Sequence, residues 1–404
     1  MDKLRVAVIT DIHAHSLPVL AKNAESWVTN QTHDSKADPF QALSLHVKAK
    51  SITADLLICA GDMADKADPG GHAYVWPKLH MLKDSLKASR LIATIGNHDI
   101  DSRLQKSEYD PKDSIQALRP HIPLEDRNSA LEFWAENFSV LEQDLYRIVV
   151  LNTCAFHGYK KLAEAEFMHG RVSPRTLTSI EDYLTQSKAR KLNILVCHHH
   201  PFKFDDIDVD DYSQMVGGDL LIQLLSRPKF GSWMIIHGHK HQSRLLFAPG
   251  VNDSPLVFAA GSFGVKFHSQ MAKVQTNQFY ILDFDLSAAP AIGAGVFGQL
   301  EAWSWIPNKN WAESRGADGL LPGSGFGCRE RASEVAKKIS EWHKSSGQPY
   351  SKWNEAKESL PVLRYCTHAD LLQIEEALEE QYSVEVNSSN GQRRTISSIA
   401  RRVP

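Results

Sequence analysis

Metal-binding side chains follow five short apolar segments of this 404-residue chain. In chain order they are Asp11 and His13 after residues 5–9, Asp62 after 55–60, Asn97, His98 and Asp99 after 91–95, His198, His199 and His200 after 193–197, and His239 and His241 after 233–236. Carboxylates and imidazoles are ligands for Mn, Fe, Zn, Co or Ni, and the lack of a thiolate among them disfavours a structural zinc site. The donors exceed the needs of one ion, so they predict two divalent ions about 3.5 to 4 Å apart.

The apolar segments have the character of buried strands, and helical patterns separate several of them. Further strand-like segments lie at 147–151, 256–260 and 279–284, and the helical patterns cover 40–50, 75–88, 173–189 and 213–226. Strands that alternate with helices indicate an α/β layered architecture. In open α/β sheets, ligands bind beyond the carboxyl ends of the strands, so we expect the five groups of side chains to converge.

The overall composition is that of an ordinary folded protein, with 42% hydrophobic and 23% charged residues. No stretch reaches the roughly 18 apolar residues of a membrane span. The N-terminus has no cleavable signal pattern, so we expect a cytoplasmic protein. A net charge of −3 provides no general field that attracts nucleic acid. No C-x-x-C pair occurs, and we expect buried, reduced thiols at Cys59, Cys154, Cys197, Cys328 and Cys366.

Changes in composition along the chain predict its domain organisation. Residues 1–290 carry the alternating strands and helices, and we expect one domain there. Within it, the charged and proline-containing segment 101–140 interrupts the pattern and indicates an insertion or lid. Glycine- and alanine-rich sequence predicts a connecting segment at 291–328. Two apolar stripes at helical spacing predict a small, mainly helical C-terminal region at 329–404.

The five motifs together resemble the calcineurin-like metallophosphoesterase superfamily. They are D-x-H at Asp11 and His13, G-D at Asp62, G-N-H-D at 96–99, a histidine before Pro201, and G-H-x-H at 238–241. All five occur in the order typical of that superfamily, over about residues 4 to 285. The resemblance implies a layered αββα fold, in which two packed mixed sheets are flanked by helices.

The resemblance also implies a ligand set for two divalent ions, with Mn²⁺ as the first candidate and Fe, Zn, Co or Ni as alternatives. One ion would be held by Asp11, His13 and His241, and Asp62 would bridge to the second. The second ion would also take Asn97, His239 and His199, with His198 as the alternative to His199.

The ions would lower the pKa of a shared water and orient the phosphoryl group for in-line attack by hydroxide. His98 would lie near the leaving group, where an imidazole can donate a proton or stabilise negative charge. We expect Asp99 to orient His98, because carboxylates often hold catalytic imidazoles in this way.

Two departures from family patterns narrow the activity. Ser/Thr protein phosphatases have G-N-H-E where this chain has Gly96-Asn97-His98-Asp99, and purple acid phosphatases have a tyrosine at the position of Asp65. His13 and the segment 170–173 resemble instead the branch that contains cyclic nucleotide and glycerophosphodiester phosphodiesterases. We therefore expect hydrolysis of a phosphodiester in a small substrate, first of all a cyclic nucleotide.

Three alternatives stay open at this point. They are a nuclease acting on DNA or RNA, a phosphomonoesterase, and a metal-retaining scaffold that acts through its C-terminal region. Four arginines near the C-terminus could form a nucleic-acid patch, but a solvated tail is the simpler interpretation.

Overall fold

The computed structural model describes residues 3–31, 37–159, 166, 169–203, 213–250, 253–267, 275–287, 295–315, 319–389 and 392–399. The chain forms two compact units. The first comprises Met1–Leu286 and Glu301–Pro322, and the second comprises Ser287–Leu300 and Gly323–Pro404.

The first unit contains two mixed β-sheets, of which the first has the strand order β12-β11-β10-β1-β2-β3. Its strands are β1 (Lys3–Ile9), β2 (Leu56–Cys59), β3 (Arg90–Ala93), β10 (Asn277–Asp285), β11 (Gly298–Ile306) and β12 (Asn310–Glu313). Strands β1, β2 and β3 are parallel, whereas β10 is antiparallel to β1. The parallel strands are largely buried on both faces, which explains why their sequences are continuously apolar.

The second sheet has the strand order β4-β5-β6-β7-β9-β8. Its strands are β4 (Phe138–Glu142), β5 (Tyr146–Leu151), β6 (Leu192–Val196), β7 (Trp233–His237), β8 (Arg244–Phe247) and β9 (Leu256–Ala259). The four central strands are parallel, and the two edge strands are antiparallel to their neighbours. Both sheets therefore direct several strand ends toward loops where a ligand can bind.

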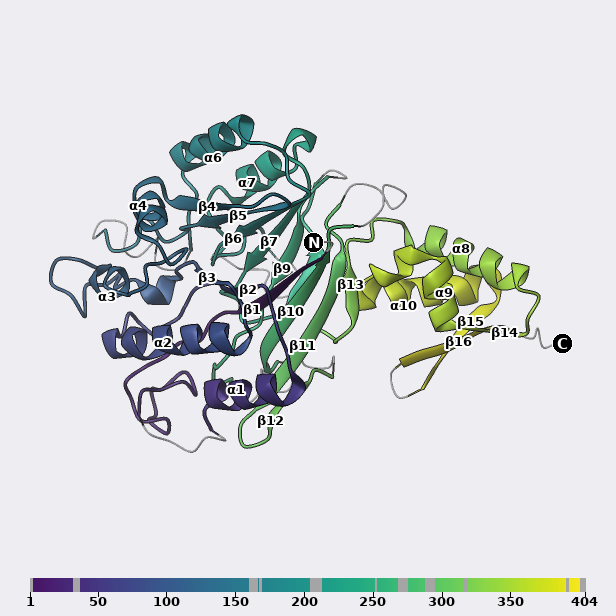
Figure 1. The fold of residues 1–404 in the computed structure, drawn as a ribbon, viewed down its shortest axis with the longest axis horizontal. Helices are drawn as coiled ribbons and strands as arrows, with labels where there is room; N and C mark the ends of the chain where they lie inside the picture. Colours follow the sequence, from purple (N-terminus) through teal and green to yellow (C-terminus); the bar gives the residue numbers. More distant parts are fainter. Residues whose placement is uncertain are drawn as a thin grey trace. The chain divides into compact units, whose positions relative to one another are not determined.

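Helices flank the two sheets (Figure 1), with α1 and α2 beside the first sheet and α6 and α7 beside the second. The helices of this unit are α1 (Pro39–Lys50), α2 (Pro69–Ser85), α3 (Asp113–Gln116), α4 (Arg127–Glu136), α6 (Pro174–Gln186) and α7 (Gly218–Leu225). The side chains of Asp38, Asp68, Asp126 and Ser173 accept backbone hydrogen bonds at helix N-termini, so polar residues define where these helices begin. The layered α/β fold expected from the sequence is confirmed.

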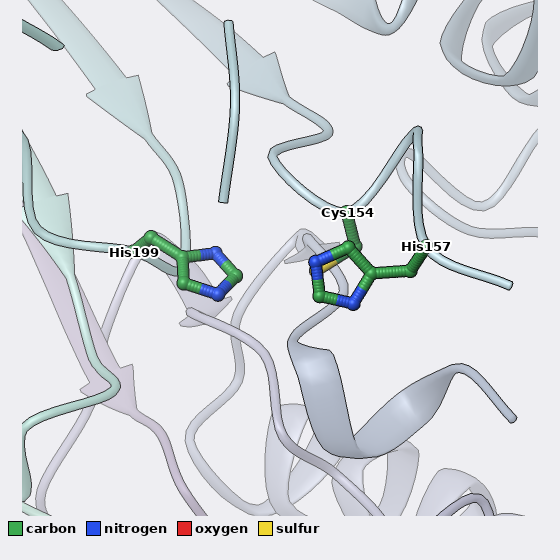
Figure 2. Close-up of side chains that lie close together, drawn as sticks. All are labelled: Cys154, His157 and His199. Atoms are coloured by element: carbon green, nitrogen blue, oxygen red, sulfur yellow. The ribbon is translucent and has the colours of Figure 1, made fainter. Parts of the chain in front are cut away.

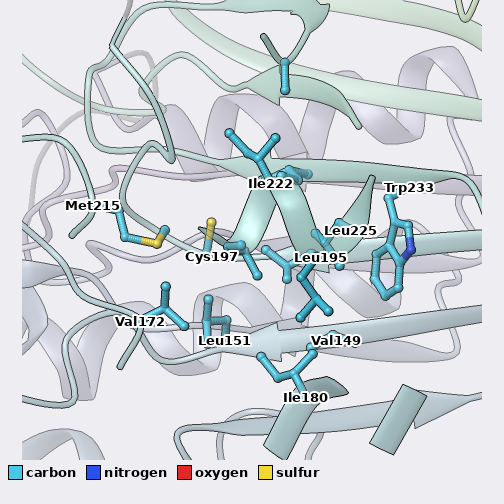
Figure 3. Packing of buried hydrophobic residues seen from close by; sticks show 14 of the residues in the cluster. Val149, Leu151, Val172, Ile180, Leu195, Cys197, Met215, Ile222, Leu225 and Trp233 are labelled. Carbon is cyan, nitrogen blue, oxygen red and sulfur yellow. The ribbon is translucent and has the colours of Figure 1, made fainter. Parts of the chain in front are cut away.

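The core of the second sheet lies between its strands and the helices α6 and α7 (Figure 3). Alternate residues enter it, for example Leu195 of β6 and Cys197 directly after that strand, and they share this core with Ile180 of α6 and Ile222 of α7. Burial of each such apolar side chain contributes roughly 1.5 to 3 kcal/mol, which fixes the positions of the loops that follow the strands. All five cysteines are buried and free, as expected.

The second unit combines helices with a three-stranded sheet of order β14-β16-β15. Its elements are β13 (Ser324–Phe326), α8 (Ala332–Ser345), β14 (Tyr350–Lys352), α9 (Trp353–Ser359), η5 (Pro361–Arg364), α10 (His368–Ala377), the π-helical turn η6 (Leu378–Tyr382), β15 (Val384–Ser389) and β16 (Gln392–Ser398). Val335 and Ile339 of α8 pack with Leu371 and Ile374 of α10 in its own core. The two apolar stripes seen in the sequence therefore face each other inside this unit.

The domain limits expected from composition differ from those in the structure. The segment 291–328, expected as a connection, contains β11, β12 and β13, and Glu301–Pro322 belongs to the first unit. The region 329–404 also contains three strands. Within 101–140, the expected insertion, α4 leads into β4, which forms the edge of the second sheet. Short strands between glycine-rich loops give little sequence signal, which explains these differences.

Among the described residues, the helices are too short or too polar to cross a membrane.

Candidate metal centre

The predicted ligands follow strands of both sheets. They are Asp11 and His13 after β1, Asp62 after β2, Asn97 after β3, His198 and His199 after β6, and His239 and His241 in the loop after β7. Hydrogen bonds between backbones hold these loops together, because the amide of His13 donates to the carbonyl of Asp62 and the amide of Gly238 donates to that of His198. The convergence expected from the sequence is therefore present.

Asp11, His13 and His241 form the first cluster, with donor atoms within 4.8 Å of one another. His241 Nε2 lies 3.3 Å from both Asp11 Oδ1 and His13 Nε2. The Thr10 hydroxyl donates to Asp11 Oδ2 at 2.8 Å and holds the carboxylate in place. Two imidazole nitrogens that face each other leave at least one lone pair directed at the other ring, an arrangement that a cation between them would stabilise.

Asp62 and His198 form the second part of the site. His198 Nδ1 lies 2.8 Å from the carbonyl oxygen of Ala60, and since a carbonyl only accepts, Nδ1 carries the proton. In the neutral ring, Nε2 then presents a lone pair, and it lies 3.2 Å from Asp62 Oδ2. Both side chains are almost completely buried, with 0% of His198 and 2% of Asp62 exposed. Either a proton or a metal ion on Nε2 satisfies this contact with the carboxylate, so the pair can hold a metal ion.

Asn97 joins the site through His239, because Asn97 Oδ1 lies 3.1 Å from His239 Nδ1. The backbone amide of His239 also donates to both oxygens of Asp11, each at 3.1 Å. The His239 ring centroid lies 5.2 Å from that of His198. These contacts connect the β3, β6 and β7 loops to the first cluster.

Five of these residues have backbone conformations in the left-handed region. They are Asp11 (φ 50°), His13 (φ 50°), Asp62 (φ 51°), His239 (φ 74°) and His241 (φ 57°). Residues other than glycine adopt this conformation uncommonly, and such residues concentrate at functional sites. The backbone thus turns sharply where it presents its donors.

His199, the preferred ligand in the sequence prediction, has different surroundings from His198. Its Nδ1 lies 2.8 Å from the Thr153 hydroxyl, and its ring lies 4.5 Å from that of His239. The group of donors around Asp11 and Asp62 includes His198 and not His199. The geometry therefore favours the alternative, His198.

His98 and Asp99 differ in their partners from what the sequence suggested. His98 Nδ1 lies 3.0 Å from Asp65 Oδ1, and its ring meets that of His13 edge-on at 4.5 Å. Asp99 instead accepts hydrogen bonds from the amides of Met63, Ala64 and Gly96 and from His72 Nε2, at 2.9 to 3.1 Å. The expectation that Asp99 orients His98 is therefore not supported by these contacts, which assign that position to Asp65.

Asp65 was missed as a positioning residue, although it carries a signal in the sequence. It lies three residues after Asp62, in a turn that returns toward the β3 loop. The partner of His98 is thus 33 residues away in sequence rather than its neighbour.

Burial and charge set the protonation of the site in opposite directions. Burial, together with His98 and His241, lowers the pKa of His13 well below its usual value. Burial alone would also lower the pKa of His198, but Asp62, Asp11 and the Ala60 carbonyl together outweigh it and raise that pKa to about 9. Burial raises the pKa of Asp11, but His241, His198 and the Thr10 hydroxyl together outweigh it, so the pKa is lowered. The site therefore attracts positive charge between two carboxylates.

A cavity of about 390 Å³ lies beside these residues. It is lined by Lys66, Asn97, His98, Ile100, Asp101, Ser102, Arg103, Gln105, Ser213 and His239. The lining includes the start of the predicted insertion at 101–140. The cavity has the size of a small-molecule site, and its lining includes Lys66, Arg103 and the two imidazoles of His98 and His239.

The chain belongs to the calcineurin-like phosphoesterase family, whose model matches residues 4–243. The family is one of phosphoesterases, which hydrolyse phosphate esters. The buried carboxylates and facing imidazoles described above fit the two divalent ions that this family implies. A second family model, wHTH-Calcineurin_assc, matches residues 324–380, within the second unit.

Solved structures of low identity resemble the chain. A purple acid phosphatase, PPD1 from yellow lupin (Lupinus luteus) seeds, is 13% identical with a TM-score of 0.48, over 76% of this chain and 52% of that one. PhoD is 9% identical with a TM-score of 0.39, over 80% and 73%. Phosphopantetheinyl hydrolase from Mycobacterium tuberculosis is 13% identical with a TM-score of 0.31, over 65% and 90%. The chain thus spans about half the length of the lupin phosphatase. No curated protein sequence matches it significantly.

Proposed function

We propose that this phosphoesterase hydrolyses a phosphodiester in a small substrate, with a cyclic nucleotide as the first candidate and Mn²⁺ as the first metal. The D-x-H motif at Asp11 and His13 and the segment 170–173 before α6 support the diesterase branch. The cavity volume of about 390 Å³ supports a small substrate.

The facing pair of Asp62 Oδ2 and His198 Nε2, at 3.2 Å, carries the assignment of ligands. In this proposal one ion is bound by Asp11, His13 and His241, and Asp62 bridges to the other. The second ion is completed by Asn97, His198 and His239. His198 replaces His199 of the sequence prediction, because Nε2 of His198 faces the Asp62 carboxylate, whereas His199 contacts the Thr153 hydroxyl.

His98 and Asp65 carry out the proton transfer in this proposal. Two divalent ions at such a site supply a water of lowered pKa and hold phosphoryl oxygens. His98 lines the cavity next to this site and donates a proton to the departing oxygen. Asp65 accepts from His98 Nδ1, which keeps the imidazole oriented and stabilises its protonated form. In agreement with that role, Asp62 and Asp65 raise the pKa of His98 despite its burial.

A pair of adjacent variants tests the ligand assignment. We expect His198→Gln to bind one Mn²⁺ fewer per chain and to lose roughly 100-fold or more of its activity on bis(p-nitrophenyl) phosphate. His199→Gln is the matched control and should keep both Mn²⁺ ions. Metal analysis of the purified variants measures this directly. The reverse pattern would restore His199 as the ligand.

The substrate class is tested with the Mn²⁺-loaded full chain. The panel contains cyclic mononucleotides, glycerophosphodiesters, p-nitrophenyl phosphate and single-stranded DNA. We expect the highest kcat/KM for a small diester. A higher value for the monoester or for DNA would replace the diesterase proposal by that of a phosphomonoesterase or a nuclease.

The second unit offers little support for a nucleic-acid substrate. Its helix α10 and the following turn expose Glu376, Glu379 and Glu380, and Glu375 is paired with Arg393. Acidic side chains repel a phosphodiester backbone. A small substrate therefore stays the favoured class.

A further inference from the structure

A second group of metal-binding side chains lies in the first unit, apart from the ligands proposed above. Cys154 and His157 lie in the turn that follows β5, and His199 lies in the loop that follows β6 (Figure 2). Their donor atoms are within 4.8 Å of one another, and their side chains are 0%, 1% and 0% exposed. β5 and β6 are adjacent parallel strands, so their loops meet at one edge of the sheet.

His199 contributes a ring nitrogen that has no other role in the structure. Its Nδ1 contacts the Thr153 hydroxyl at 2.8 Å, whereas Nε2 is buried and has no hydrogen-bond partner among the residues that the structure describes. A buried polar nitrogen without a partner is unfavourable and indicates an absent ligand. The Thr153 contact would also orient the imidazole, as hydrogen bonds on the second nitrogen commonly do in metal sites.

His157 faces His199 across this group, with ring centroids 5.8 Å apart. One of its nitrogens contacts the Ser102 hydroxyl at 3.1 Å, and the other lies 3.2 Å from the carbonyl oxygen of His169. An ion takes one of these nitrogens, and the hydrogen bond on the other then fixes the ring. The sulfur of Cys154 makes a long contact, 3.7 Å from the carbonyl oxygen of Ile95.

We propose that Cys154, His157 and His199 hold a Zn²⁺ ion that is separate from the two ions of the phosphoesterase centre. One sulfur and two imidazole nitrogens, without a carboxylate, form a softer donor set than that around Asp62 and suit Zn²⁺ better than Mn²⁺. On binding, the Cys154 thiol releases its proton to solvent and the thiolate binds the ion. The zinc joins the β5 and β6 loops directly beside His198.

The proposal rests on the assignment of His198, and not His199, to the phosphoesterase centre, and metal analysis tests it independently of activity. The full chain is freed of metal and reloaded with Zn²⁺ or Mn²⁺. We expect about three equivalents of Zn²⁺ per chain and two of Mn²⁺. Cys154→Ser should bind one Zn²⁺ fewer, whereas Cys59→Ser, which removes another buried thiol, should bind the full number.

Cobalt identifies the sulfur ligand. Co²⁺ bound to a thiolate absorbs in the near ultraviolet by charge transfer, and we expect this band in the reloaded wild type. It should disappear in Cys154→Ser and persist in Cys59→Ser and in His241→Gln, which alters only the phosphoesterase centre. A failure of that centre would therefore leave the band intact.

A measurement on the wild-type protein does not depend on whether the variants fold. X-ray absorption at the zinc edge of the wild type should show sulfur at about 2.3 Å from zinc. Two equivalents of Zn²⁺ with only nitrogen and oxygen neighbours would overturn the proposal. So would a thiolate band that survives in a folded Cys154→Ser variant.

Discussion

Replacement of Asp99 by asparagine tests how the loops after β2 and β3 are held together. Asp99 Oδ1 accepts from the amides of Met63 and Ala64 at 2.9 and 3.0 Å, and Oδ2 accepts from the amide of Gly96 at 2.9 Å. The carboxylate is completely buried. It therefore fixes the spacing between the two loops that present Asp62 and Asn97.

The size of the effect follows from these contacts. Asparagine can keep one oxygen as an acceptor, but its NH₂ group would face the Gly96 amide and leave that donor unsatisfied, at a cost of about 1 to 3 kcal/mol. The remaining hydrogen bonds lose the assistance of the charge. We expect Asp99→Asn to lower the free energy of unfolding of the metal-free protein by about 4 kcal/mol. Urea denaturation followed by tryptophan fluorescence measures it, and calorimetry should show weaker Mn²⁺ binding.

Asp65→Asn is the matched comparison, because it removes the carboxylate that contacts His98. We expect it to slow an alkyl diester more than a p-nitrophenyl diester, since the poorer leaving group needs the proton more. Asp99→Asn should leave this ratio unchanged. If Asp99→Asn instead kept its stability and altered the ratio, the division of roles between the two carboxylates would be refuted.

Three further predictions concern the frame of the site. In Gly238→Ala, the new Cβ would lie 2.2 Å from Thr10 Oγ1 and 2.4 Å from Asp11 Oδ2, so we expect at least a roughly tenfold loss of Mn²⁺ affinity by calorimetry; unchanged affinity would show that this contact is dispensable. Burial lowers the pKa of His237 to about 4. Between pH 6.5 and 4 the unfolded chain therefore binds more protons than the folded chain. As the pH falls through this interval, the free energy of unfolding should decrease by about 3 kcal/mol. Denaturation at several pH values checks this, and His237→Gln should reduce the slope. Leu195→Ala in the core of the second sheet should cost about 2 to 5 kcal/mol in urea denaturation, and a smaller loss would mean that the core refills the space.

The sequence predicts the positions of the buried strands and the convergence of the side chains that follow them, because each buried parallel strand is a short apolar segment that ends at a polar residue. Asp11, Asp62 and His241 are examples of residues that are far apart in the chain and come together in this way. Their convergence follows from the rule that the carboxyl ends of parallel strands lie at the same edge of a sheet.

The choice between His198 and His199 could not be made from the sequence. All three histidines of this run are buried, so polarity does not separate them. The local backbone after β6 decides which ring turns toward Asp62 and which toward Thr153. A difference of one position in a loop is beyond what a pattern of residue types can specify.

Neighbourhood in the sequence also misled the prediction for His98. Asp99 is adjacent in the chain, but the short 3-10 turn at Asn97–Asp99 directs its carboxylate toward the β2 loop. Asp65 is distant from His98 in the sequence, and the fold brings the two side chains together. The strands β11 and β12 were also missed, because they lie between glycine-rich segments that favour a connection.

Asp11, His13, Asp62, His239 and His241 adopt left-handed backbone conformations, so stability and metal binding favour different residues at these positions. Glycine would relax each of these positions, by about 1 kcal/mol, but it carries no donor for an ion. Heat resistance and catalysis therefore favour different residues at the same five places. Selection for stability alone would favour glycine at these five positions, and the protein would then lose its metal ligands there.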